Sequence, residues 1–315
     1  MRRVFAIGGI AALVAVFTAV QTPSAAVARR GSVGVASPVR IWTVHYRAHD
    51  GLVRPAYVVL PRWYGPDRHP PIPLVISPHG RGVDARANAR IWGTLPALGG
   101  FAVVNPEGQG RRLELYSWGD RGQIGDLARM PAIVHRALPW LRIDKRRVYA
   151  FGGSMGGQET LLLVGHYPHL LAGAAAFDAP TNMIVRYRDF AFLQHGHAIQ
   201  ELARVEIGGP PHADRRAYVE RSPLDEARKI AFSGVPLQIW WSRTDRVVTD
   251  QADESGLLFR EIKRLNPDAN VVQMIGEWAH TAEMRASTRL PIALGLFGLL
   301  PPASAHYGAG RRPVV

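Results

Sequence analysis

Hydrophobic residues follow two alternating patterns along most of this chain. Short apolar runs typical of buried strands occur at residues 74–77, 101–105, 147–151, 171–177, 236–241 and 271–275. Apolar residues at helical spacing lie at residues 131–141, 155–167, 254–265 and within 281–300. Strands that alternate with helices favour a parallel sheet with helices on both faces. The pattern therefore predicts an α/β fold.

The chain before these elements has a different pattern. Residues 41–46 and 52–60 are alternating or apolar runs on either side of His49, Asp50 and Gly51. An Asp-Gly pair favours the tight turns of hairpins, so we expect an antiparallel hairpin that extends one edge of the sheet. In the helix predicted at 131–141, Pro131 fits the first turn, where its missing amide costs no hydrogen bond.

The first 28 residues are typical of a secretory signal. Arg2 and Arg3 precede an apolar stretch at residues 4–20, and small residues at 26–28 form a cleavage site. The alternative is an uncleaved membrane anchor, for which the apolar run is short. The paired arginines do not distinguish a twin-arginine signal from an ordinary one. We expect an exported protein.

After residue 28 the chain divides into three parts. Residues 29–40 form a short basic leader, and residues 41–300 form one α/β domain, to which the motifs below assign catalysis. The alternation lapses at about residues 178–235, which are too many for an ordinary connection. We interpret them as an insertion above the strand ends, where ligands bind in such sheets. Residues 301–315 are rich in Pro, Gly and Arg, and we expect a disordered tail.

The composition excludes some kinds of catalytic chemistry and some kinds of partner. The 315 residues are 47% hydrophobic, which is enough for one large core, and they include no cysteine, so disulfides and a thiolate nucleophile are excluded. The net charge of +13 would suit nucleic acid. However, the arginines are scattered and no aromatic stacking platform is visible, so we expect no nucleic-acid partner. Attraction to an anionic cell surface is consistent with the charge.

The sequence GGSMG at residues 152–156 lies between a predicted strand and a predicted helix. It fits G-x-S-x-G, in which a sharp strand-to-helix turn projects Ser154 above the sheet. The residues two before and two after the serine must be small, because side chains there would collide with the turn. The alternative is a glycine-rich turn in which the serine only caps the helix. We predict that Ser154 is a nucleophile.

A serine nucleophile needs a base, and the base needs an acid that orients it. Asp245 follows the predicted strand at 236–241, and His280 follows the one at 271–275. The order Ser, Asp, His after successive strands is that of this type of catalytic triad. A turn-forming aspartate and an exposed loop histidine are the alternatives. The reserve acids are Asp250, Asp253 and Glu277.

A triad also needs amides that bind the oxyanion of the reaction intermediate. The amide of Met155, one residue after the nucleophile, is one expected donor. A second is expected from the loop after residues 74–77, with the amide of Arg81 preferred over that of Gly82. We interpret His79 in this loop as a structural hydrogen-bonding residue.

Three further histidines could suggest a metal site. His195, His197 and His212 lie in the insertion without paired carboxylates or cysteines, which is a weak metal-ligand pattern. We therefore predict no metal and no cofactor. Aromatic residues of the insertion, with Trp118 and Trp278, could line an acyl or aryl pocket, although ordinary packing explains them equally.

These motifs resemble those of the α/β-hydrolases over residues 41–300. The prolyl-oligopeptidase-like and feruloyl-esterase-like groups are the most similar, on the sequences GGSMGG at 152–157, ERSP at 220–223 and DRVV at 245–248. The resemblance implies hydrolysis of peptides or carboxylic esters through an acyl-enzyme. It implies that Ser154 is the nucleophile, His280 the base and Asp245 its orienting acid.

We therefore expect a secreted serine hydrolase, a carboxylesterase in the first place, that acts on a small-molecule or polymer-linked ester. Oligopeptidases carry a large N-terminal propeller, and few residues here precede the first strand, which favours an esterase. The alternatives are a peptidase with the same triad, an acyltransferase that passes the acyl group to an alcohol, and a binding protein without catalysis. The acyl group, the alcohol and the oligomeric state do not follow from the sequence.

Overall fold

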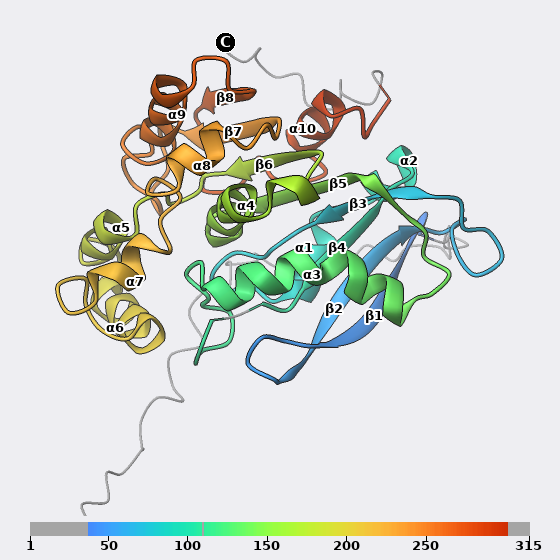
Figure 1. Ribbon diagram of the computed structural model, residues 1–315, viewed down its shortest axis with the longest axis horizontal. Helices are drawn as coiled ribbons and strands as arrows, with labels where there is room; N and C mark the ends of the chain where they lie inside the picture. Colours follow the sequence, from blue (N-terminus) through green and yellow to red (C-terminus); the bar gives the residue numbers. More distant parts are fainter. Residues whose placement is uncertain (1–36, 109, 302–315) are drawn as a thin grey trace, which may run out of the picture. The chain divides into compact units, whose positions relative to one another are not determined.

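A computed structural model describes residues 37–108 and 110–301 (Figure 1). The chain divides into two units, residues 1–36 and residues 37–315, and all described residues belong to the second. The predicted signal at 1–28 and all but the first residue of the predicted tail lie outside the described residues. In the described part, eight strands form one sheet in the order β1-β2-β4-β3-β5-β6-β7-β8. The strands are β1 (Val39–Arg47), β2 (Val53–Pro61), β3 (Ile72–Ile76), β4 (Ala102–Pro106), β5 (Ile143–Gly153), β6 (Gly173–Phe177), β7 (Leu237–Ser242) and β8 (Val271–Gly276).

The sheet is mostly parallel, as predicted, with an antiparallel edge. β1 pairs with β2 in antiparallel register from Val39 opposite Pro61 to Arg47 opposite Val53, and β2 pairs antiparallel with β4. The remaining neighbours are all parallel. The predicted hairpin around Asp50 and Gly51 is therefore confirmed. Parallel strands all end at one rim of the sheet, and the loops that leave this rim carry the site described below.

Helices cover both faces of the sheet. One face packs against α3 (Arg121–Ala137), α4 (Met155–His166), α8 (Ala227–Ala231) and α9 (Ser255–Leu265). The other face packs against α1 (Ala85–Arg90), α2 (Leu95–Gly99) and α10 (Leu290–Leu296). The short 3-10 helix η1 (Pro168–Leu170) connects α4 to β6. Nearly every side chain of α4 is buried, because this helix leaves the centre of the sheet and is covered by α3 and α8.

The prediction that Pro131 opens a helix was wrong. α3 begins ten residues earlier, at Arg121, and Pro131 lies inside it. The side chain of Asp120 caps the helix by accepting hydrogen bonds from the amides of Gly122 and Gln123. Burial of one face of the helix, including Leu127, offsets the backbone hydrogen bond that a proline inside a helix removes.

Four helices lie between β6 and β7, where residues 178–235 were predicted to form an insertion. They are α5 (Met183–Phe190), α6 (Gly196–Ile207), α7 (Arg215–Val219) and α8. The first three have a small core of their own, built around Met183, Tyr187, Phe190 and Tyr218, which also includes Trp118 from the loop before α3. The aromatic side chains of this core lie beside the loops at the carboxyl ends of the strands.

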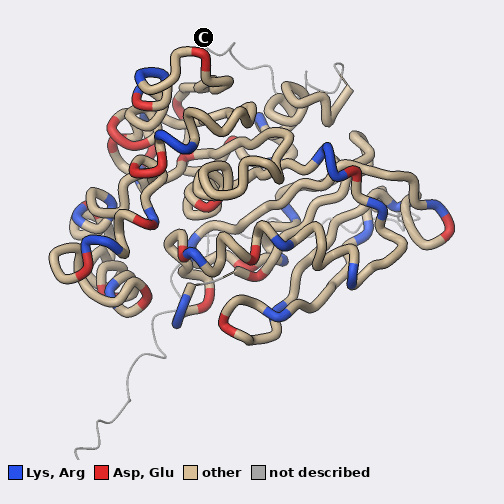
Figure 2. The backbone as a smooth tube through the Cα atoms, in the orientation of Figure 1, with Lys and Arg blue, Asp and Glu red and all other residues tan. Residues whose placement is uncertain are grey.

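Figure 2 shows Lys and Arg interspersed with Asp and Glu through most elements of the described chain. Several of these charges form pairs within one helix, such as Arg216 with Glu220 and Arg264 with Glu261. Within residues 37–108 and 110–301, no helix combines the length and the apolar character that crossing a bilayer requires.

Candidate active site

The three predicted catalytic residues follow the carboxyl ends of three parallel strands. Ser154 follows β5 directly, Asp245 comes three residues after β7, and His280 comes four residues after β8. β5, β6, β7 and β8 are successive neighbours in the sheet. Their loops therefore converge at one rim, as the sequence order predicts.

Ser154 has the strained backbone expected of a nucleophile turn. Its φ is 56° and its ψ is −127°, a combination that non-glycine residues rarely adopt. The turn is fixed from below, because the amide of Ser154 donates a 2.8 Å hydrogen bond to the carbonyl of Phe177 at the end of β6. The side chain of Ser154 makes no capping hydrogen bond to α4, so the hydroxyl is left available.

The glycines on either side of Ser154 are required by close packing. A Cβ atom on Gly152 would lie 2.1 Å from the carbonyl oxygen of Gly156, inside the turn itself. A Cβ atom on Gly156 would lie 2.3 Å from the carbonyl oxygen of Pro78, in the loop after β3. The first glycine is therefore required by the turn, as predicted. The second is required because the β3 loop packs directly against the start of α4.

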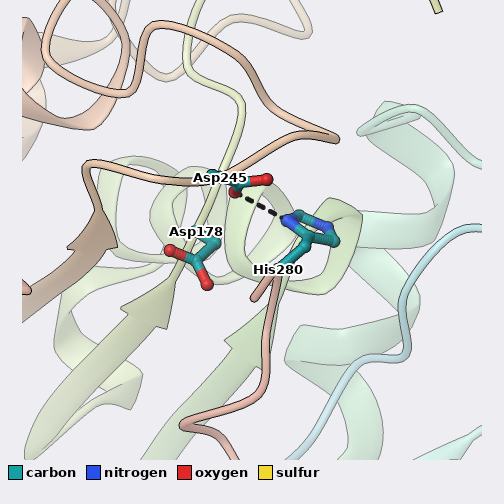
Figure 3. Close-up of side chains that lie close together, drawn as sticks. All are labelled: Asp178, Asp245 and His280. Carbon is teal, nitrogen blue, oxygen red and sulfur yellow. Dashed lines mark hydrogen bonds and ion pairs between the residues drawn. The ribbon is translucent and has the colours of Figure 1, made fainter. Parts of the chain in front are cut away.

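Asp245 and His280, the predicted orienting acid and base, are hydrogen-bonded to each other. Nδ1 of His280 lies 2.7 Å from a carboxylate oxygen of Asp245. Figure 3 marks this hydrogen bond with a dashed line. The other oxygen of Asp245 accepts hydrogen bonds from the amides of Val247 and Val248. Burial by itself would raise the pKa of Asp245, but the hydrogen bond and charge of His280, with these amides, outweigh it and lower the pKa. Asp245 is thus a carboxylate that holds the imidazole in one orientation.

The nucleophile and the base are close without being joined. No hydrogen bond links Ser154 to His280 among the described residues, and Nε2 of His280 has no partner there. The two loops nevertheless touch, since a Cβ atom on Gly153 would lie 3.1 Å from a side-chain carbon of Thr281. Catalytic hydrogen bonds are often long before substrate binds. The arrangement therefore leaves both Oγ and Nε2 free to face a substrate.

The predicted oxyanion donors differ in availability. The amide of Met155 opens α4, and neither it nor the amide of Arg81 donates to any described residue. The amide of Gly82, in contrast, donates a 3.0 Å hydrogen bond to the carbonyl of Leu115. Gly80 lies against the nucleophile turn, with its Cβ position 3.8 Å from Cβ of Ser154. The amides of Met155 and Arg81 therefore remain the expected oxyanion donors, whereas the amide of Gly82 is already used.

His79 has a structural role in the same loop. Its buried ring lies between two backbone groups, with Nδ1 2.9 Å from the carbonyl of Gly80 and Nε2 2.8 Å from the carbonyl of Gly108. Both nitrogens are occupied, so the ring fixes the β3 loop and is not available as a second base.

Sequence reasoning missed Asp178, which lies beside the triad. It follows β6 directly, has a positive φ of 46° and is fully buried. Its carboxylate accepts hydrogen bonds from the Ser242 amide, the Trp278 indole and the Thr281 amide, at 3.0, 2.9 and 2.8 Å. Burial, with a smaller contribution from the charge of Asp245, raises the pKa of Asp178 to about 6. The sequence carried one signal for it. Asp178 is the first residue after β6, the strand that lies between the strands preceding Ser154 and Asp245.

Asp178, Asp245 and His280 also form the one group of described residues close enough to hold a metal ion. Each carboxylate oxygen of the two aspartates already accepts at least one hydrogen bond from a protein N–H group. These donors direct positive hydrogen atoms at the oxygens, which is the arrangement of a hydrogen-bond network and not of a cation site.

The remaining predicted residues have other surroundings. His195 precedes α6 in a left-handed conformation, and neither it, His197 nor His212 is part of the group just described. Trp278 is buried and contacts Asp178 through its indole. Arg221, from the sequence ERSP, pairs with Asp120 at 2.9 Å and so ties the segment before β7 to the cap of α3.

A narrow hollow opens beside Ser154; the space between its lining residues is about 300 Å³ when the adjoining open solvent is included. Met155, Trp118, Met183, Phe190 and Val248 supply most of its apolar lining, and Arg81 and Arg186 add two positive charges. A larger hollow of about 560 Å³ is lined by the first residues of β7 and β8, at the ends opposite the catalytic loops. The smaller pocket is therefore the candidate substrate site. Trp118 was expected as a pocket residue from the sequence, whereas Arg186 was not.

The sequence itself matches no family model, and no curated protein is significantly similar to it. Solved structures with the same fold are nevertheless found. Acylaminoacyl peptidase from Pyrococcus horikoshii matches with a TM-score of 0.62 and 16% identity, over 82% of this chain and 41% of that one. S-formylglutathione hydrolase from Staphylococcus aureus matches with a TM-score of 0.54 and 17% identity, over 77% of this chain and 92% of that one.

A puromycin-hydrolyzing peptidase from Mycobacterium tuberculosis matches with a TM-score of 0.56 and 20% identity, over 79% of this chain and 37% of that one. This chain thus covers about two fifths of each peptidase and nearly all of the S-formylglutathione hydrolase. The neighbours are peptidases and an esterase-like hydrolase, and their agreement shows that this chain has the α/β-hydrolase fold.

Proposed function

We propose that this α/β-hydrolase-fold chain is a serine hydrolase that cleaves carboxylic esters through an acyl-enzyme. The observation that carries the proposal is the Asp245–His280 hydrogen bond of 2.7 Å at the rim where the strained turn presents Ser154. A buried aspartate that holds a histidine, next to a serine with an unbonded hydroxyl, is the arrangement that serine hydrolysis requires.

In this mechanism, Oγ of Ser154 attacks the acyl carbon while Nε2 of His280 takes the hydroxyl proton. The amides of Met155 and Arg81 bind the oxyanion that forms. When the bond between the acyl carbon and the alkoxy oxygen breaks, His280 gives its proton to the leaving alcohol. Water then attacks the acyl-enzyme with His280 again as base, which releases the carboxylic acid and restores Ser154.

The ester substrate is placed first because an ester is the easier bond to cleave: its leaving oxygen depends less on protonation than the leaving nitrogen of an amide. S-formylglutathione hydrolase shares the fold. A peptidase with the same triad is the second candidate, because both peptidases share the fold. Hydrolysis of matched p-nitrophenyl esters and p-nitroanilides with one acyl group separates the two, since an amide needs its leaving nitrogen protonated.

The decisive experiment combines labelling with mutation. The full chain should hydrolyse p-nitrophenyl butyrate, and a fluorophosphonate probe should label Ser154. Ser154→Ala should abolish both, whereas Ser287→Ala, at an exposed serine before α10, should retain both. Folded protein that neither reacts with the probe nor cleaves any ester or anilide would falsify the proposal.

Export is proposed separately, from residues 1–28 alone. Processing after Ala28 would give a mature chain that begins at Arg29. N-terminal sequencing of the protein recovered from the medium of a secreting host tests this, and an intact N-terminus starting at Met1 would contradict it.

A further inference from the structure

Two arginines line the pocket beside Ser154 without a protein partner. Arg186, on α5, is 3% exposed, and its guanidinium forms no hydrogen bond or ion pair with any described residue. Its Nη1 atom is fully buried in this unpartnered state. Arg81, from the β3 loop, is partly buried and likewise lacks a hydrogen-bonding partner among the described residues. A buried cation without a partner is strongly unfavourable, so the presence of Arg186 here requires an explanation.

Each guanidinium lies over an aromatic ring that lines the same pocket. Arg186 is 4.7 Å from the ring centre of Phe190, and Arg81 is 5.7 Å from that of Trp118. Such contacts attract the cation and limit its movement, but they leave the N–H groups at its edge unused. The two positive groups are therefore held in place at the pocket before any ligand enters.

Nearby acids do not neutralise Arg186. Burial above all, and secondarily the charge of Arg81, lowers its pKa to about 10, against the opposing effect of Glu254. Glu254 forms no ion pair with Arg186: one of its oxygens accepts three hydrogen bonds from Thr181 and Asn182, and the other is buried without a partner among the described residues. Asp245, which also opposes the shift, is paired with His280.

Other polar atoms around the pocket show the same excess of donors. The indole Nε1 of Trp118 is buried and unpartnered, as is the amide oxygen of Gln158. One acceptor thus stands beside three donor groups, those of Trp118, Arg81 and Arg186. A ligand that supplies oxygen acceptors and negative charge would satisfy these donors.

The pocket also indicates which part of a substrate it holds. Ser154 and Met155, which contact the acyl carbon and its oxyanion in the proposed mechanism, are lining residues, whereas His280 is not. The leaving alcohol must lie against His280, because it takes its proton from that residue. The pocket therefore lies on the acyl side, and its small volume suits a short chain.

From this geometry we infer that the enzyme prefers short acyl groups that end in a carboxylate, which Arg186 and Arg81 bind inside the acyl pocket. The inference rests on the proposed function and adds the substrate class. A planar carboxylate matches the fork of a guanidinium, and a half-ester of a dicarboxylic acid supplies one at the right end of the chain.

The test compares two esters that differ in one group. 4-Nitrophenyl hydrogen adipate and 4-nitrophenyl hexanoate have acyl chains of equal length, ending in a carboxylate and a methyl group. With spontaneous hydrolysis subtracted, wild-type kcat/KM should be higher for the adipate. Arg186→Met should lower the adipate-to-hexanoate ratio by about tenfold to hundredfold, the usual range for a lost charge-assisted bond. Arg186→Lys should restore part of the ratio, because it restores the charge.

Arg188→Met is the matched control, because Arg188 is exposed on the same helix, and it should keep the wild-type ratio. Labelled, active enzyme that prefers hexanoate, or whose ratio is unaffected by Arg186→Met, overturns the inference and leaves the proposed function intact. If no ester is cleaved, calorimetric titration of monomethyl adipate into the Ser154→Ala chain decides the inference alone. Binding that requires Arg186 supports it, and no binding overturns it.

Discussion

The carboxylate of Asp178 accepts a 2.8 Å hydrogen bond from the amide of Thr281, the residue directly after His280, across 103 positions of sequence. The same carboxylate holds the indole of Trp278 on the other side of the histidine. The loop that carries the base is thus fixed at both flanks by the end of a strand two places away in the sheet. We therefore expect Asp178 to be a positioning residue: its substitution should disturb catalysis although its side chain does not contact the substrate.

We expect Asp178→Asn to lower kcat/KM at least about tenfold, because an amide offers one acceptor oxygen where three N–H groups converge. Burial raises the pKa of Asp178 to about 6, so the wild-type carboxylate gains a proton and loses acceptor capacity as the pH falls through that value. The acidic limb of the pH profile should therefore change shape in the variant, which steady-state kinetics from pH 5 to 8 would show. Asp268→Asn, at an exposed site, is the control, and a wild-type rate and profile in Asp178→Asn would refute the role.

Asp245→Asn should reduce kcat by about 10³–10⁴-fold with little change in fold, because an amide favours the wrong tautomer of His280. Ester hydrolysis with circular dichroism of the same sample measures both effects. Asp250→Asn removes a reserve acid in the same loop and should be near wild type. A larger loss in Asp250→Asn than in Asp245→Asn would reassign the orienting acid.

Gly156→Ala should impair both activity and stability. Its methyl group would lie 2.3 Å from the carbonyl oxygen of Pro78, so either α4 or the β3 loop must move, at a cost of about 1–3 kcal/mol. Gly165→Ala is the matched control on the same helix, since its methyl group would meet side-chain carbons at 3.5 Å or more. That variant should be stabilised by up to about 1 kcal/mol. Urea unfolding of both variants measures their stabilities. A Gly156→Ala chain as stable as the Gly165→Ala chain would contradict the prediction.

Glu159 should make stability depend on pH. It is completely buried on α4 beside Ser117, and burial raises its pKa to about 8. The folded chain therefore keeps a proton that the unfolded chain loses near pH 4.5, so the free energy of unfolding declines as the pH rises toward 8. The slope from this group is about 1 kcal/mol per pH unit. Glu159→Gln should flatten that decline in denaturant titrations from pH 5 to 8, whereas Glu201→Gln on the exposed face of α6 should not. An equal slope in Glu159→Gln would show that another group is responsible.

The order of elements could be predicted from the sequence because hydrophobic runs report burial directly. The strands that carry Ser154, Asp245 and His280, and the hairpin at the sheet edge, lie where the pattern indicates. The start of α3 could not be placed correctly because Pro131 is usually a first-turn residue. In the folded chain, the cap at Asp120 and the buried face of the helix outweigh that local preference.

The parts of the site that sequence reasoning missed depend on contacts between distant segments. A pattern of apolar residues shows that a strand ends before Asp178 but not that its carboxylate turns toward residues 242 and 281. The position of Arg186 beside Ser154 depends on how α5, through Phe190, packs against Trp118, which no local spacing encodes. In the same way, the sequence does not show that the amide of Gly82 donates a hydrogen bond to the carbonyl of Leu115, which lies in a separate loop.

The end of β6 holds both members of the proposed catalytic pair, Ser154 and His280. The carbonyl of Phe177 holds the amide of Ser154, and the carboxylate of the next residue, Asp178, holds the loop of His280. The predicted nucleophile and the loop of the predicted base are therefore both hydrogen-bonded to the same end of β6. If the sheet flexes in solution, both would be carried in the same direction, and their separation would vary less than if each were anchored on its own strand. Tolerance of sheet motion would thus be a built-in property of this arrangement.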